Sequence, residues 1–132
     1  MKDISLEWLR SAKSDIETID AILEKEQLTH IVAFHAQQCV EKCLKAVIEE
    51  FELHAGKIHN LITLKEIVSK VKEFNFSEDI LSVLNTLYID FRYPGSFGLL
   101  PDGNPTREDA KKFYEFAYKV YLDVNKFLSV GS

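Results

Sequence analysis

The sequence predicts an all-α protein, an up-and-down four-helix bundle with one additional short helix. Apolar residues recur every three or four positions along most of the chain, a period typical of amphipathic helices and not of strands. The longest of these segments reach about twenty residues, and most connections between them are short, which favours antiparallel neighbours. With no internal repeat and no linker, we expect a single helical-bundle domain over residues 1–132.

Start signals and apolar spacing set the bounds of the first three predicted helices. The first covers residues 5–25, with Ser5 as its N-cap, because a serine hydroxyl can accept hydrogen bonds from the first turn. The second covers residues 29–53. The third covers residues 59–73, where apolar side chains including Val71 recur at helical spacing and are expected to face inward.

The last two helices are bounded by capping residues and by a proline. Ser77 is a predicted N-cap for the fourth helix, which ends near Phe91 because a proline three residues later disfavours helical backbone just before it. Thr106 and Asp109 resemble a capping box, with aspartate in place of the usual glutamate. The fifth helix therefore covers residues 107–128.

The composition is ordinary for a globular protein, with 46% hydrophobic and 28% charged residues. A net charge of −5 argues against a uniformly basic nucleic-acid-binding surface, although a local basic patch is compatible with it. No segment approaches the ~20 apolar residues of a membrane span, and the first residues do not resemble a signal peptide. We therefore expect a cytoplasmic protein without membrane contact.

The two cysteines, Cys39 and Cys43, lie four residues apart on one predicted helix. A bridge between them would strain the helix, so reduced, buried thiols are expected, as in a reducing compartment. No metal site and no other cofactor is predicted, because ligands at suitable spacing are missing. The phosphate-binding loops and the nucleophile elbow of familiar enzymes are also missing.

A polar stripe on the second predicted helix is the strongest candidate for a functional site. His35, Gln38, Lys42 and Lys45 are spaced by three, four and three residues, which stacks them on one helix face, and Glu41 lies at its edge. Two interpretations are open: a polar site at an interface, or a solvated face with a Glu41–Lys45 pair worth about 0.2–0.5 kcal/mol. An adjoining face is predicted to be core: Val32, Ala36, Cys39, Val40, Cys43, Val47 and Phe51.

Two further places hold polar side chains near helix ends. His59 falls at the start of the third predicted helix, where it either caps the helix or joins a site. Arg92 lies at the end of the fourth, where a cation stabilises the helix dipole or binds a phosphate or carboxylate. Tyr93 either stacks on a base or packs under the loop that follows.

Together these residues resemble the HEPN family of small helical-bundle domains. The block from Phe34 to Ala46 is similar to the family pattern H-x-x-Q-x-x-E-K-x-x-K, and His59 with Leu61 resembles its H-[DN]-L element. Arg92-Tyr93-Pro94, followed by a helix near Thr106, completes the likeness, which extends over most of the chain. Each element alone is weakly specific, and their order and spacing make the resemblance.

The resemblance implies a dimer with a polar site near its interface. In prokaryotes it also implies a neighbouring small nucleotidyltransferase, in a toxin–antitoxin-like pair. Many active members are metal-independent ribonucleases that use an arginine followed closely by a histidine. Here the corresponding positions after Arg92 hold Phe97, Gly98 and Leu99, so the expected proton carrier is missing.

The leading hypothesis is a non-catalytic, dimeric HEPN subunit that binds a nucleotide or RNA phosphate and partners a minimal nucleotidyltransferase. The alternatives are a metal-independent ribonuclease toxin that uses a displaced histidine, either His35 or His59, and a helical protein-interaction adaptor. No catalytic residue is assigned. The candidate ligand-binding residues are Gln38, Glu41, Lys42, Lys45, His59, Arg92 and Tyr93.

Overall fold

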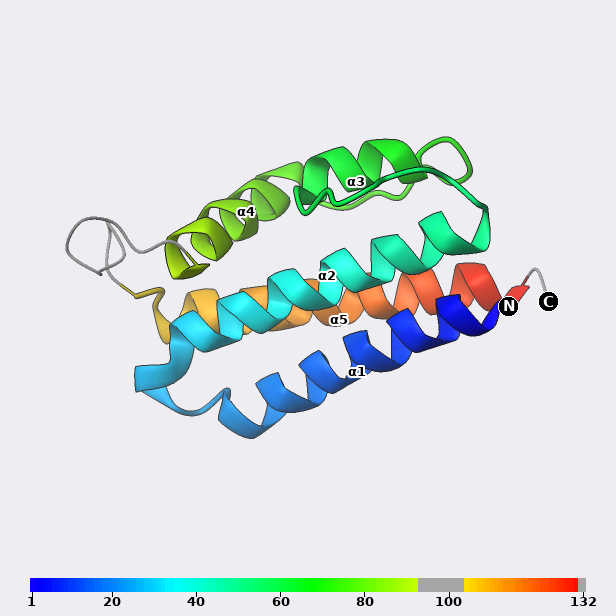
Figure 1. The fold of residues 1–132 in the computed structure, drawn as a ribbon. Coiled ribbons are helices and arrows are strands. Elements are labelled where there is room, and N and C mark those ends of the chain that lie inside the picture. Colours follow the sequence, from blue (N-terminus) through cyan, green and yellow to red (C-terminus); the bar gives the residue numbers. More distant parts are fainter. Residues whose placement is uncertain (93–103, 131–132) are drawn as a thin grey trace.

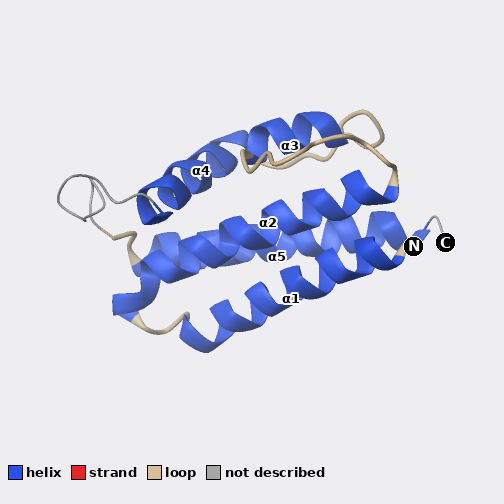
Figure 2. Cartoon of the chain, viewed as in Figure 1, coloured by secondary structure: helices blue, strands red, loops and turns tan. Residues whose placement is uncertain are grey.

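The computed structural model describes residues 1–92 and 104–130, and over these residues the protein contains five α-helices and no strand (Figures 1 and 2). The predicted all-α class is confirmed. None of the helices in these two ranges is long and apolar enough to cross a lipid bilayer. The helices are α1 (Asp3–Ile22), α2 (Thr29–Glu50), α3 (Leu61–Val68), α4 (Glu78–Arg92) and α5 (Arg107–Val130).

Helix α2 is the centre of the bundle. It packs against α1, α5, α4 and α3, and 13 of its 22 residues are buried. Figure 1 shows α1 along one side of α2, the short α3 and then α4 along the other, and α5 behind. The predicted arrangement of four main helices and one short helix is therefore found, with α3 as the short one.

The core consists of aliphatic side chains from all five helices, together with several phenylalanines. Leu44, Leu64, Leu81 and Val120 are fully buried where the helices meet. Both cysteines are reduced and buried, as predicted, and desolvation raises the pKa of Cys43 well above its ordinary value. That thiol therefore behaves as an apolar core group.

The start of α1 differs from the prediction. The helix begins at Asp3 with Lys2 in the N-cap position, and Ser5 lies fully buried inside the first turn. The Leu6 N–H already donates to the Lys2 carbonyl at 3.1 Å, so no side-chain cap is needed at Ser5. The helix also stops earlier than predicted, because Lys25 donates to the Ile22 carbonyl at 2.9 Å in a closing turn.

The end of α2 also lies upstream of the predicted residue 53. Glu52 adopts a left-handed backbone conformation with φ of 54°, and its N–H donates to the Glu49 carbonyl at 3.3 Å. The Leu53 N–H donates to the Ile48 carbonyl at 2.9 Å, which completes a Schellman motif. Phe51, predicted to be core, is consequently turned outward and is 43% exposed.

The third helix is shorter than predicted and is capped by a different residue. Asn60, not His59, caps it, because its Oδ1 accepts from the Ile62 and Thr63 N–H groups at 3.0 and 3.1 Å. The helix ends at Val68, and Val71 beyond it is exposed rather than inward-facing.

The predicted capping signals of the last two helices are confirmed. Ser77 Oγ accepts from the Ile80 N–H at 3.3 Å, at the start of α4. Thr106 and Asp109 form the reciprocal capping box: each backbone N–H donates to the other side chain, at 3.1 and 3.0 Å. These bonds set the first turn of α5.

Candidate functional site: a polar seam along the central helix

Two clusters of polar side chains lie along α2, and together we call them the polar seam. Helix α2 supplies six of its members, α1 supplies one, and the residue before the Asn60 cap supplies the last. Figure 1 shows α1 and α3 on opposite sides of α2, so the two clusters join α2 to both neighbours. The polar seam consists of Asp15, His35, Gln37, Gln38, Glu41, Lys42, Lys45 and His59.

The first cluster is organised by Asp15 of α1, whose side chain is 7% exposed. His35 Nδ1 lies 2.8 Å from its Oδ1, and Lys42 Nζ donates to its Oδ2 at 2.9 Å. Because an ionised carboxylate only accepts hydrogen bonds, His35 carries its proton on Nδ1. Both carboxylate oxygens are thereby satisfied, and the imidazole and the ammonium are held one on each.

The second cluster is organised by Glu41, whose side chain is 8% exposed. Lys45 Nζ donates to its Oε2 at 2.8 Å, and His59 Nδ1 lies 2.9 Å from the same oxygen. Gln37 Nε2 donates to Glu41 Oε1 at 3.0 Å, and Gln38 Nε2 donates to the side-chain Oε1 of Gln37 at 2.7 Å. The buried carboxylate therefore has three donors.

Electrostatics keep Glu41 ionised in this position. Burial alone would raise its pKa, but the hydrogen bonds from Lys45, His59 and Gln37 outweigh burial and hold the pKa below its ordinary value. The carboxylate is thus negative at neutral pH and fixes the adjacent cation.

His59 reaches the polar seam because α3 and α4 fix the chain next to it. Asn85 of α4 accepts from the Leu61 N–H at 2.9 Å and donates to Asn60 Oδ1 at 3.2 Å. The Gln37 side chain also donates to the His59 carbonyl at 3.5 Å. These bonds fix the backbone from the His59 carbonyl onward and so position the imidazole, whose side chain is 53% exposed.

The side-chain exposures decide between the two interpretations of the stripe. Lys42 and Lys45 are only 20% and 13% exposed, and Glu41 is nearly buried. The stripe is therefore a semi-buried network with α1 and α3, and the interpretation as a solvated face with one loose ion pair is wrong. Only His59 is broadly open to solvent.

The aromatic side chains of α2 and α4 border the polar seam at its His35 end. Phe34 stacks on Tyr88 with ring centroids 5.9 Å apart, and Tyr88 lies 6.5 Å from His59. Arg92 is the last residue of α4, one turn beyond Tyr88, so its backbone lies at the end of the helix that borders the seam. The Arg92 side chain and Tyr93 lie outside the described residues, so the two predicted roles stay predictions.

Two members of the polar seam were missed in the sequence analysis, Asp15 and Gln37. Asp15 falls on the apolar stripe of α1, between Ala12 and Ile19, where a carboxylate has no place in a core unless it is paired. A charged residue on an apolar stripe could therefore have identified Asp15 as a candidate site residue from the sequence. Gln37 is fully buried on the inner side of α2, and only the contact with Glu41 reveals its role.

The polar seam has hydrogen-bond donors that its own carboxylates do not use. With both imidazoles neutral, the two carboxylates and two ammonium groups cancel, and each imidazole that gains a proton adds one positive charge. Each ammonium group has three donors and gives one to a carboxylate, so donors remain for a ligand. In the described part of the chain, no three His, Cys, Asp or Glu side chains are grouped as they would be around a metal ion.

Comparisons with known proteins identify the class of small helical domain to which this bundle belongs. The family model of the HEPN domain matches residues 5–127, so the chain belongs to the HEPN domain family. The predicted resemblance is thereby confirmed. A comparison with curated protein sequences finds no match.

Among solved structures, the chain is similar to the crystal structure of ST0689, an archaeal HEPN homologue. The TM-score is 0.64 and the sequence identity is 22%, with 96% of this chain and 98% of that chain covered. At this identity the similarity shows the shared fold.

The substitution Glu41→Gln tests how strongly the second cluster is held together. We expect the free energy of unfolding at neutral pH to fall by about 1–3 kcal/mol, because Lys45 is left with a poorly paired, semi-buried charge. The pKa of Glu41 lies below its ordinary value of 4.5, so its stabilisation is present above that pH and is lost as the pH falls through the folded-state pKa. The difference in free energy of unfolding between wild type and variant, measured by urea denaturation, is therefore expected to become smaller at acidic pH.

The matched control is Glu7→Gln, which removes an exposed carboxylate paired with Arg10 on the surface of α1. The control is expected to change the free energy of unfolding by no more than about 0.5 kcal/mol. Equal losses in the two variants, or a Glu41→Gln loss that does not depend on pH, would contradict the assignment.

Proposed function

We propose that this protein is a non-catalytic HEPN subunit that binds a nucleotide or an RNA phosphate at the polar seam. The observation that carries the proposal is a fixed row of Lys42 and Lys45 on α2 with His59 beside it, each held by a buried carboxylate. Cations held in place before binding lose little conformational entropy when an anion arrives. Such a row is therefore a better phosphate site than surface lysines of the same number.

In this proposal the two carboxylates hold the cations in position, and the cations contact the ligand. A phosphate that approaches from solvent meets the remaining N–H donors of the two lysines and the half-exposed imidazole of His59. Gln38 lies one turn before Lys42 on α2 and offers an amide to a sugar or base edge. Arg92 and Tyr93, at the end of α4, complete the proposed set.

The proposed assembly is a homodimer that partners a minimal nucleotidyltransferase in a toxin–antitoxin-like pair. Partner and pairing rest on the family resemblance alone. The dimer has additional support, because α5 exposes Tyr118 and Leu122 one turn apart, at 40% and 50%. Adjacent exposed apolar residues of this size favour a protein contact.

Nucleotide binding is testable by titrating ATP, GTP and a short RNA into the protein by calorimetry. Lys42→Gln and Lys45→Gln are expected to weaken binding about tenfold or more, because each loses a charged hydrogen bond to phosphate but keeps a donor for its carboxylate. Arg92→Ala is expected to act in the same direction.

The control for this titration is Lys13→Ala, which removes an exposed lysine of α1 outside the polar seam. It is expected to leave the affinity unchanged at physiological salt. If none of the three ligands binds, the proposed function fails and a protein-interaction adaptor becomes the better hypothesis. Equal losses in Lys13→Ala and Lys42→Gln would indicate nonspecific charge attraction.

The dimer is testable by light scattering, which should give twice the mass of one chain. Leu122→Glu is expected to produce a monomer, because it places a charge in the proposed apolar contact. Val71→Glu changes another exposed apolar residue, beyond α3, and should leave the dimer intact. A wild-type monomer would refute this part of the proposal.

A ribonuclease is the second candidate, and one observation favours it. Both His35 and His59 bind a carboxylate through Nδ1, which leaves Nε2 as the reactive nitrogen. A pair of imidazoles held in this way can divide the work of RNA cleavage when one is neutral at Nε2 and the other carries a proton there. One takes the proton of the 2′-hydroxyl as it attacks the phosphorus, and the other protonates the leaving 5′-oxygen.

This candidate predicts cleavage of total RNA in EDTA, with loss of cleavage in His59→Ala and in His35→Ala. The control is His30→Gln, which replaces the imidazole in the first turn of α2, outside the polar seam, and should leave cleavage unchanged. RNA that stays intact with purified wild-type protein would exclude this candidate and leave the non-catalytic proposal.

A further inference from the structure

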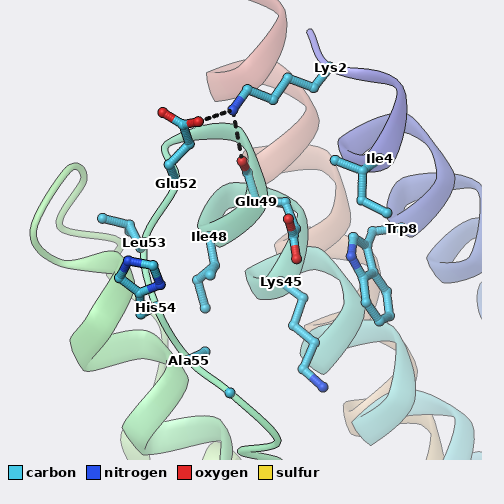
Figure 3. A pocket seen from close by; sticks show the side chains of 11 residues that line it. Lys2, Ile4, Trp8, Lys45, Ile48, Glu49, Glu52, Leu53, His54 and Ala55 are labelled. Carbon is cyan, nitrogen blue, oxygen red and sulfur yellow. Dashed lines mark hydrogen bonds and ion pairs between the residues drawn. The ribbon is translucent and has the colours of Figure 1, made fainter.

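A cavity of about 490 Å³ opens beside the Lys45 end of the polar seam. Its walls come from the start of α1, the second half of α2 and the segment 52–56 (Figure 3). The volume falls within the range of small-molecule sites. Lys45 lines this cavity and also donates to Glu41, so it belongs to both the cavity and the polar seam.

The walls of the cavity are joined before any ligand arrives. The Lys2 backbone N–H donates to Glu50 Oε1 at 2.8 Å, and Lys2 Nζ lies 3.4 Å from Glu52 Oε1. Figure 3 shows Lys2 bridging the end of α2 and the segment that follows it. The start of α1 is thus bound to the Schellman turn at the end of α2, and the cavity is preformed.

Trp8 and Lys45 together give the cavity its chemical character. The Lys45 ammonium lies 5.5 Å from the centre of the Trp8 ring, close enough for a cation–π contact. Trp8 Nε1 is buried and has no hydrogen-bond partner among the described residues. Because this nitrogen is covered by neighbouring atoms, the indole ring and the Lys45 ammonium, and not the indole N–H, are the groups that the cavity offers to a ligand.

The remaining walls add an acceptor and apolar surface. Glu49 lies one turn beyond Lys45 on α2 and brings a carboxylate into the lining. Ile48 and Leu53 supply aliphatic surface. The cavity therefore offers a flat aromatic surface, the ammonium donor of Lys45 and a carboxylate acceptor, a set that matches a planar ring with both acceptor and donor atoms on its edge.

We propose that this cavity is the base subsite of the nucleotide site, with the nucleobase packed against Trp8. The proposal rests on the proposed function, since the phosphate is assigned to the polar seam. Ring nitrogens and carbonyls of a base accept hydrogen bonds, and exocyclic amino groups donate them. Aromatic side chains commonly support bases by stacking. Lys45, common to both sites, lies between base and phosphate.

The test uses Trp8 as its own reporter, because the chain has a single tryptophan. GMP, AMP, CMP, the nucleosides guanosine and adenosine, and ribose 5-phosphate are titrated into wild-type protein, and tryptophan emission and calorimetric heat are recorded. The nucleotides are expected to quench or shift the emission, and ribose 5-phosphate to bind without doing so. This measurement needs no variant and does not depend on how a substitution affects folding.

Two variants make the test sharper. Trp8→Leu is expected to weaken nucleotide binding about 5- to 150-fold and to leave ribose 5-phosphate binding unchanged. Ala55→Leu narrows the cavity from the opposite wall and should act in the same direction. Phe51→Leu, which removes an exposed aromatic ring outside the cavity lining, is the matched control and should change neither.

The outcomes separate this inference from the proposed function. One outcome is that Lys42→Gln weakens nucleotide binding, while nucleotides do not change Trp8 emission and bind Trp8→Leu as tightly as wild type. In that case the base subsite is overturned and the phosphate site stands. If nucleosides quench Trp8 as well as nucleotides do, the base subsite stands and the phosphate assignment fails. If nothing binds, both are overturned.

Discussion

Two carboxylates buried beside α2 control how the polar side chains of this protein are arranged. A buried charge without partners costs several kcal/mol, so Asp15 and Glu41 must each retain a cation and further donors. The pairs Asp15–Lys42 and Glu41–His59 also join α2 to α1 and to the start of α3. Helix packing and the position of the charged groups are therefore set by the same contacts.

Stability alone is a weak reason for such a network. Buried ion pairs in proteins are often no more stabilising than apolar side chains of the same volume, and removing one partner costs far more than the pair contributes. A bundle with leucine at both carboxylate positions would pack its helices adequately. An apolar core could not hold charged side chains in fixed positions. The network does so for Lys42 and Lys45 of α2 and for His59 beside them, and fixed charges of this kind favour ligand binding.

The helical periodicity of the sequence was sufficient to predict the fold, and it predicted part of the candidate site. Helical spacing predicted five helices and placed Lys42, Lys45 and Glu41 on one face, because a side chain's direction on a helix follows from its position in the sequence. Contacts between helices do not follow in that way. The role of Asp15 depends on how α1 lies against α2. The end of α2 depends on Glu52 accepting a left-handed conformation that sequence rules assign to glycine.

The Schellman turn missed in the sequence analysis is also what joins the polar seam to the cavity. Because α2 ends before it, Leu53 lies in the segment that lines the cavity, across from Trp8 (Figure 3). Lys45 lies where the two regions meet, paired with Glu41 on one side and 5.5 Å from the Trp8 ring centre on the other. A ligand that spans both regions can contact this ammonium without breaking its ion pair, since one carboxylate uses only one of its three donors.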